Sequence, residues 1–175
     1  MKRWALLCGV MLLSAVAASA QDNPKVEAFG GYSYLHVSDQ GASANFNGGS
    51  GSVSYNPNNW LGLVADFGGY HWSGSGADAN VITYMFGPKI AFRSGKVTPF
   101  VQTLFGGGHI SGSAFGGSGS ENAFAMALGG GVDWNATPHI GVRVIQAEYL
   151  LTKFNDGLNN RQNNARISAG VVFRF

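Results

Sequence analysis

The chain ends in the stretch RISAGVVFRF, which runs from Arg166 to Phe175. One face of this stretch would carry Ile167, Ala169, Val171, Phe173 and Phe175, and the other Arg166, Ser168, Gly170, Val172 and Arg174. A period of two residues predicts a β-strand with one apolar face and one face that bears charge. The fold of the whole chain depends on which solvent each of these faces meets.

The same period of two recurs along the chain, whereas the 3.6-residue period of an amphipathic helix is absent. Many aromatic residues (13%) and few charged residues (11%) argue against disorder. Alternating runs bounded by turn residues predict eight strands, most of them long enough to cross a bilayer when tilted. The predicted strands are residues 25–37, 48–55, 60–71, 81–92, 97–109, 122–134, 139–151 and 165–175.

The connections between these strands alternate in length. Three short turns are expected at residues 56–59, 93–96 and 135–138, and four long polar segments at residues 38–47, 72–80, 110–121 and 152–164. In an up-and-down arrangement, all the short turns fall on the side that holds both ends of the strand set. Short turns on one side and long loops on the other are typical of a transmembrane barrel.

On the other strands too, the large apolar residues lie on one face, and the charged and small residues lie on the other. In the strand expected at residues 81–92, Ile82 and Phe86 share one face, while Gly87 and Lys89 share the other. Two barrels could produce this division. A soluble, lipocalin-like carrier turns its apolar face inward, whereas a membrane barrel turns that face to lipid. The crowding of small residues on the charged face favours a narrow interior, and therefore the membrane barrel.

Aromatic residues gather at the two ends of the apolar face, as in the interfacial girdles of membrane barrels. Those expected on the short-turn side are Tyr55, Trp60, Phe92, Trp134 and Phe175, and those near the long loops are Tyr34, Trp72 and Tyr149. We therefore predict an all-β fold. It is an eight-stranded, antiparallel, up-and-down transmembrane β-barrel with short periplasmic turns and four long external loops.

The first twenty residues predict a secretory signal peptide. Lys2 and Arg3 precede an apolar run, and Ala18, Ser19 and Ala20 form a small-x-small cleavage site. The barrel domain would then comprise residues 21–175, with nine basic and nine acidic residues after Lys2 and Arg3 are subtracted. A neutral chain offers no basic face for nucleic acid. The single cysteine, Cys8, lies within the predicted signal, so no disulfide is expected.

The chain resembles the small eight-stranded outer-membrane barrels of the OmpA transmembrane-domain and OmpX/Ail type. The opening VEAFGGYSYL at Val26, the stretch VTPFVQTLFGGG at Val97 and the terminal phenylalanine carry this resemblance. It implies an integral protein of the outer membrane of a Gram-negative-type bacterium, surrounded by outer-membrane lipid. It also implies that Phe175 is the assembly signal read by the barrel-assembly machinery. Unlike full-length OmpA, the chain ends at the barrel, so no peptidoglycan-binding domain is expected.

Charged residues on the inward face are expected to form a paired network, because buried charge is costly unless paired. The expected members are Glu27, Asp66, Lys89, Asp133, Arg143, Glu148, Arg166 and Arg174. Strict alternation from Arg143 would leave Glu148 on the lipid face, so we predict a β-bulge around residues 144–146. An eight-stranded barrel is only wide enough for its side chains to fill, which excludes a wide porin.

These features favour a structural membrane barrel whose external loops could recognise a protein or glycan surface. A narrow or gated path for ions or small solutes is the alternative. A lipid-modifying enzyme is less favoured, because His36 and His109 each precede a serine by two residues but lack the further groups of a catalytic site. His36, His71 and His109 lack the spacing of a metal site. No catalytic, cofactor-binding or metal-binding residue is assigned.

Overall fold

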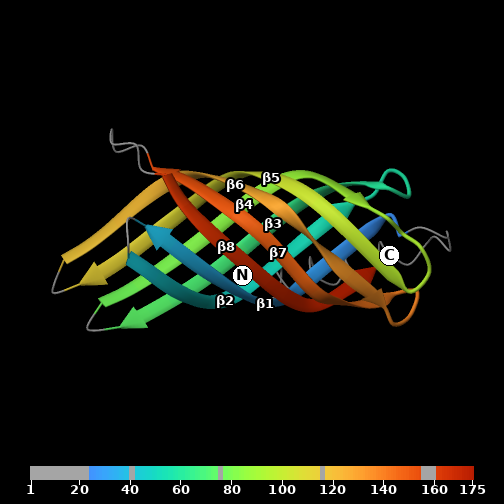
Figure 1. The fold of residues 1–175 in the computed structure, drawn as a ribbon, viewed down its shortest axis with the longest axis horizontal. Coiled ribbons are helices and arrows are strands. Elements are labelled where there is room, and N and C mark those ends of the chain that lie inside the picture. The colour runs from blue at the N-terminus through green and yellow to red at the C-terminus, as the bar shows by residue number, and fades with distance from the viewer. Residues whose placement is uncertain (1–23, 40–41, 75–76, 115–116, 155–160) are drawn as a thin grey trace, which may run out of the picture.

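The computed structural model is a single closed β-barrel (Figure 1). It describes residues 24–39, 42–74, 77–114, 117–154 and 161–175, so the predicted signal peptide lies outside the described residues. Each strand pairs antiparallel with its neighbours in sequence, and β1 pairs with β8 to close the barrel. The predicted eight-stranded, up-and-down barrel is therefore confirmed. No helix in the described ranges is long and apolar enough to span a membrane.

The strands are longer than the sequence pattern predicts, because they continue into the polar segments at one end of the barrel. Their bounds are β1 Val26–Asp39, β2 Ala42–Tyr55, β3 Leu61–Gly74, β4 Ala77–Ala91, β5 Val97–Ala114, β6 Gly117–Asn135, β7 Ile140–Phe154 and β8 Arg161–Arg174. Much of the length expected as loop is therefore paired strand, including Ser38 with Ser43 and Gly74 with Ala77. These segments are rich in Gly, Ser, Asn and Asp, so they lack the apolar alternation by which strands are recognised.

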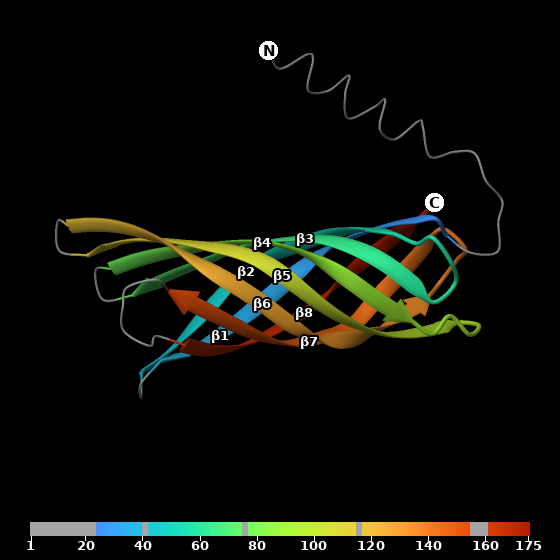
Figure 2. The ribbon, with the colours of Figure 1, turned by 90° about the horizontal axis from the view of Figure 1, so that it is seen from above.

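The two ends of the barrel differ, as Figure 2 shows. One end carries the short connections and the C-terminus, and we call it the turn end; the other carries the extended hairpins, and we call it the hairpin end. At the turn end, Phe175 continues the pairing of β8 with β1 through two backbone hydrogen bonds with Val26, of 2.9 and 3.1 Å. Among the short turns, Gly95 takes a positive φ of 65°, a conformation that glycine adopts at little cost.

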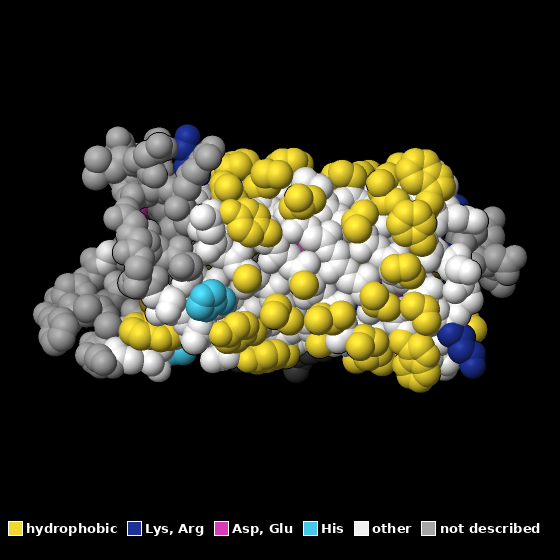
Figure 3. Space-filling view, in the orientation of Figure 1, with side chains coloured by type: hydrophobic (Ala, Val, Ile, Leu, Met, Phe, Trp, Pro, Cys, Tyr) yellow, Lys and Arg dark blue, Asp and Glu magenta, His cyan; other side chains and the backbone are white. Residues whose placement is uncertain are grey.

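Large apolar side chains cover the outside of the barrel (Figure 3). In β3, for example, Leu63 and Phe67 are 56% and 61% exposed, whereas Val64 and Asp66 between them are buried. The alternation seen in the sequence thus separates the outside from the interior of the barrel. An outside of this kind suits the hydrocarbon of a membrane.

A β-bulge in β7 interrupts this alternation. Val144 and Ile145 are consecutive, yet both are exposed on the outside, at 58% and 47%. The register with β6 and with β8 shifts at this point. The extra residue changes the phase of the strand, so Gln146 and Glu148 both point inward and are buried. The bulge predicted from the sequence is confirmed.

The seam between β1 and β8 depends on glycine. Gly31 lies opposite Gly170, and both occupy positions that face the interior. A Cβ at Gly31 would lie 2.2 Å from the carbonyl oxygen of Ala169, and a Cβ at Gly170 would lie 2.3 Å from that of Gly30. Any side chain here would force the two strands apart, so these glycines permit the close approach that closes the barrel.

Candidate functional site

The interior of the barrel is the candidate site, because it holds all eight charged residues predicted to face inward, each at most 5% exposed. At the turn end, Glu27 of β1 accepts a hydrogen bond from Lys89 of β4, with Nζ 2.5 Å from Oε2. Arg174 of β8 approaches the other oxygen of Glu27 to 3.3 Å. Lys89 also donates to Ser54 at 3.0 Å, so three strands besides β1 converge on this carboxylate and its partner.

A second ion pair lies between β6 and β7. Arg143 donates from Nε and Nη2 to the two oxygens of Asp133, at 2.8 and 3.2 Å. The guanidinium also lies 4.3 Å from the ring centroid of Phe29 and 4.4 Å from that of Phe100, within the range of cation–π contacts. Arg174 connects this pair to Glu27, since its Nη2 lies 3.6 Å from Asp133.

Arg166 of β8 is the centre of a third group. It donates from Nη1 to Asp66 of β3 at 2.7 Å and from Nε to Glu148 of β7 at 2.6 Å. The other oxygen of Glu148 accepts a hydrogen bond from Gln102 of β5 at 2.8 Å. This group therefore crosses the lumen and ties together strands that are not neighbours in the barrel.

Each of the four inward carboxylates has at least one cationic partner within 4.0 Å. Such pairing offsets the cost of taking the charges out of water, and bidentate arginine geometry also fixes the positions of the side chains. The network also contains a cation from a stretch that the sequence predicts as a turn. Arg93 folds back into the barrel, donates to the backbone of Asn59, and places Nη2 3.4 Å from Glu27.

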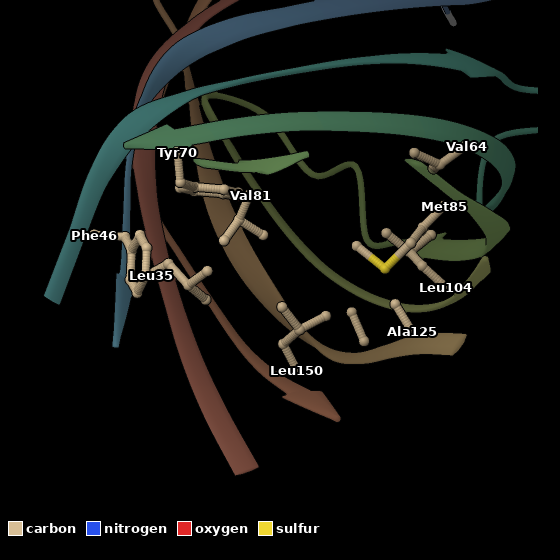
Figure 4. Packing of buried hydrophobic residues seen from close by; sticks show 10 residues of the cluster. Leu35, Phe46, Val64, Tyr70, Val81, Met85, Leu104, Ala125 and Leu150 are labelled. Carbon is tan, nitrogen blue, oxygen red and sulfur yellow. The ribbon is translucent and has the colours of Figure 1, made fainter. Parts of the chain in front are cut away.

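An apolar cluster fills the interior toward the hairpin end (Figure 4). Its buried members come from seven strands: Leu35, Phe46, Val64, Tyr70, Val81, Met85, Leu104, Ala125, Ala127 and Leu150. Leu104 is fully buried, and Leu35 and Leu150 are 1% exposed. This cluster is not predicted by the pattern of the sequence. Where the cluster lies, both faces of several strands are apolar, so the period of two no longer distinguishes inside from outside.

Most of the aromatic residues predicted at the interfaces lie on the outside of the barrel. At the turn end Tyr55, Trp60, Phe92 and Trp134 are exposed and Phe175 is half-buried. Nearer the hairpin end, Tyr149 is exposed and Tyr34 is half-buried.

The placement of Trp72 is a correction to the prediction. Its side chain is half-buried and packs against the interior apolar cluster, with its ring centroid 6.4 Å from that of Phe46. The reason is that β3 continues without a phase change to Gly74, so Trp72 shares the inward face of Tyr70.

The histidines of the hairpin end make hydrogen bonds to asparagines on neighbouring strands. The ring of His36 bonds through Nδ1 to Asn45 at 2.7 Å, and that of His109 bonds to Asn122 at 2.8 Å. Each ring is thus directed to the neighbouring strand instead of to the serine two residues further along its own strand. Within the described part of the chain, no group of three or more His, Cys, Asp or Glu residues is placed to hold a metal ion.

Comparison with known proteins places this barrel in a family. The family model described as "Outer membrane protein beta-barrel domain" matches residues 5–175, and the chain belongs to this family. The protein is therefore an outer-membrane β-barrel. A search of curated proteins found no match.

Several solved structures have a similar fold. Neisserial surface protein A is 17% identical with a TM-score of 0.70, and the match covers 86% of this chain and 97% of that one. Ail, the attachment invasion locus protein of Yersinia pestis, is 23% identical with a TM-score of 0.62 and coverages of 86% and 99%. The N-terminal barrel domain of Pseudomonas aeruginosa OprF is 15% identical with a TM-score of 0.59 and coverages of 88% and 100%. At these identities the likeness establishes the shared fold alone.

Proposed function

We propose that this protein is a structural outer-membrane barrel with a sealed lumen. The observation that carries the proposal is that a paired ionic network and an apolar cluster together fill the lumen and meet where Met85 of the cluster pairs with Asp66 of the network. An ion that entered the lumen would have to break buried ion pairs and pass apolar side chains, where it loses its hydration. The geometry therefore supports a plug over an ion path.

Conductance in planar bilayers tests this proposal against the alternative of a narrow or gated pore. Refolded protein whose electrophoretic mobility shifts on heating should give no discrete conductance steps. The matched variant Leu104→Ala/Leu150→Ala, which shortens two side chains of the apolar cluster while leaving the ion pairs in place, should leak measurably. Reproducible unitary steps from the unmodified barrel would refute the sealed lumen.

We also propose that the extended hairpins recognise an external protein or glycan surface. The support comes from β5 and β6, which have 18 and 19 residues, whereas about 9–11 residues suffice to cross the hydrocarbon of a membrane. One structural neighbour is described as an attachment invasion locus protein, which agrees with such a role for this fold.

Truncation of the β5–β6 hairpin tests the recognition proposal. Replacing residues 110–121 by a two-residue turn should leave a heat-modifiable barrel, because the removed segment lies beyond the membrane-facing part of both strands. Attachment of protein-bearing cells or vesicles to a glycan- or protein-coated surface should fall to the level of barrel-free controls. Unchanged attachment would show that this hairpin is not part of the recognition surface. Cleavage of the signal peptide before Gln21 and recognition of Phe175 during assembly remain predictions of the sequence.

A further inference from the structure

Three histidines on the outside of the barrel share the same kind of partner. Each accompanies an asparagine directly opposite on the next strand, and each ring nitrogen Nδ1 lies 2.7–2.8 Å from the Oδ1 of that asparagine. The pairs are His36–Asn45 between β1 and β2, His71–Asn80 between β3 and β4, and His109–Asn122 between β5 and β6. Three of the four hairpins thus carry the same polar pair, and we call the set the His–Asn belt.

The belt lies at the outer edge of the apolar surface. In β3, His71 follows Leu61 by ten residues, and the outward positions between them are Leu63, Ala65, Phe67 and Gly69. Ten residues rise about 33 Å along a strand, or about 25 Å along the membrane normal at a tilt near 40°. That height equals the usual apolar band of an outer-membrane barrel. Figure 3 shows histidine side chains at the edge of the field of hydrophobic side chains.

The surroundings of the belt are mostly polar. Two tyrosines at this end make the same kind of cross-strand bond, Tyr32 to Asn47 at 2.6 Å and Tyr149 to Asn163 at 2.5 Å. Within the described strands, two charged residues with outward side chains lie beside the belt: Lys153, which pairs with Phe124 two residues on the turn side of Asn122, and Asp78, two residues beyond Asn80. The belt therefore faces a zone that requires hydrogen bonds, with one described lysine, Lys153, beside the His109–Asn122 pair.

The hydrogen bond within each pair determines which atoms remain for a ligand. The asparagine Oδ1 can only accept, so the histidine Nδ1–H donates to it. The histidine Nε2 is left as an acceptor and the asparagine Nδ2–H₂ as a donor, and neither has another hydrogen-bond partner among the described residues. A hydroxyl group matches this combination, because it can donate to Nε2 and accept from Nδ2.

We propose that the His–Asn belt binds the hydroxyl-rich saccharide headgroups of glycolipids in the leaflet at the hairpin end. The belt continues the lipid-facing surface outward, so the molecules already in contact with the apolar band bring their headgroups to this height. Its unoccupied donors and acceptors match hydroxyl groups, and the pairs at His36 and His71 have no lysine or arginine beside them, among the side chains that the structure describes, to attract phosphate. The same pair recurs on separate hairpins, so several lipid molecules around the barrel can be bound at once.

Native mass spectrometry of the full barrel released from nanodiscs tests the proposal. The discs contain phosphatidylcholine and phosphatidylglycerol, with or without monogalactosyl diacylglycerol as the probe. The test variant carries alanine at the three histidines, and the matched control carries alanine at exposed, outward-facing serines of the hairpins: Ser43, Ser73 and Ser120.

The unmodified barrel and the serine control should retain the galactolipid over phospholipid by at least about threefold, as expected for one or more net hydrogen bonds per lipid. The histidine variant should lose this preference while keeping its heat-modifiable mobility. Equal retention by the histidine variant, or a preference for phosphatidylglycerol, would overturn the proposal. If the triple variant fails to fold, the ¹⁵N shift of histidine Nε2 in the unmodified barrel replaces it: a change on adding galactolipid supports the proposal, and no change overturns it.

Discussion

Replacement of Arg166 gives the sharpest prediction about the ionic network. The Arg166 side chain is fully buried and donates to Asp66 and Glu148, which are 1% and 4% exposed. Arg166→Met keeps most of the volume of the side chain but leaves both carboxylates without their cation. Breaking a buried ion pair by removing one partner typically costs about 3–5 kcal/mol. We expect the free energy of unfolding to fall by about that amount.

A neutral version of the same group supplies the control. The triple variant Arg166→Met/Asp66→Asn/Glu148→Gln removes the unpaired charges together with the cation, so most of the lost stability should return. The measurement is urea unfolding of the refolded barrel in detergent micelles, followed by tryptophan fluorescence and by the heat-dependent electrophoretic shift. A loss below about 1 kcal/mol for Arg166→Met, or no recovery in the triple variant, would show that the two carboxylates do not depend on Arg166.

Three further predictions concern the bulge, the seam and the apolar cluster. Val144→Lys and Ile145→Lys should each lower the free energy of unfolding in lipid, by about 2–4 kcal/mol near the midplane, since both residues face outward at the bulge; tolerance of lysine at either position would indicate a regular strand. Gly170→Ala should destabilise by about 1–3 kcal/mol because of the clash at the seam. Gly30→Ala, where nothing lies within 4 Å of the added Cβ, is its control, and equal effects in urea unfolding would contradict the close approach. Leu104→Ala should cost about 2–5 kcal/mol in the same assay, and a neutral result would mean that the cluster is loosely packed.

The sequence allows the fold and the ionic network to be predicted because both depend on alternation. A lipid-facing strand must separate apolar from charged residues, so the inward positions of Glu27, Lys89 and Arg174 follow from their phase. Even the exception at Glu148 is predictable, since a charge facing hydrocarbon is too costly to be tolerated and a bulge is the smallest change that removes it.

The apolar cluster and the outer ends of the strands could not be predicted from alternation. Leu104 and Phe46 lie inside, but their sequence surroundings do not show which face is inward when both are apolar or both are polar. Trp72 is an example. Its phase within β3 places it on the inward face, whereas its nearness to an expected loop suggested a position at the outer interface. The role of Arg93 depends on the fold of a turn, and turns carry no alternation at all.

The sealed lumen can be tested by its accessibility to a water-soluble thiol reagent. In a chain in which Cys8 is replaced by serine, no other cysteine is present, so a single cysteine reports one position. Met85→Cys places it in the apolar cluster, where the native side chain is 2% exposed, and Ser43→Cys places it on the exposed outside of the hairpin end. A sealed lumen predicts that the cysteine at position 43 reacts rapidly and the one at position 85 reacts only after unfolding. Comparable reaction rates at both positions in the folded barrel would show a water-filled path and contradict the account.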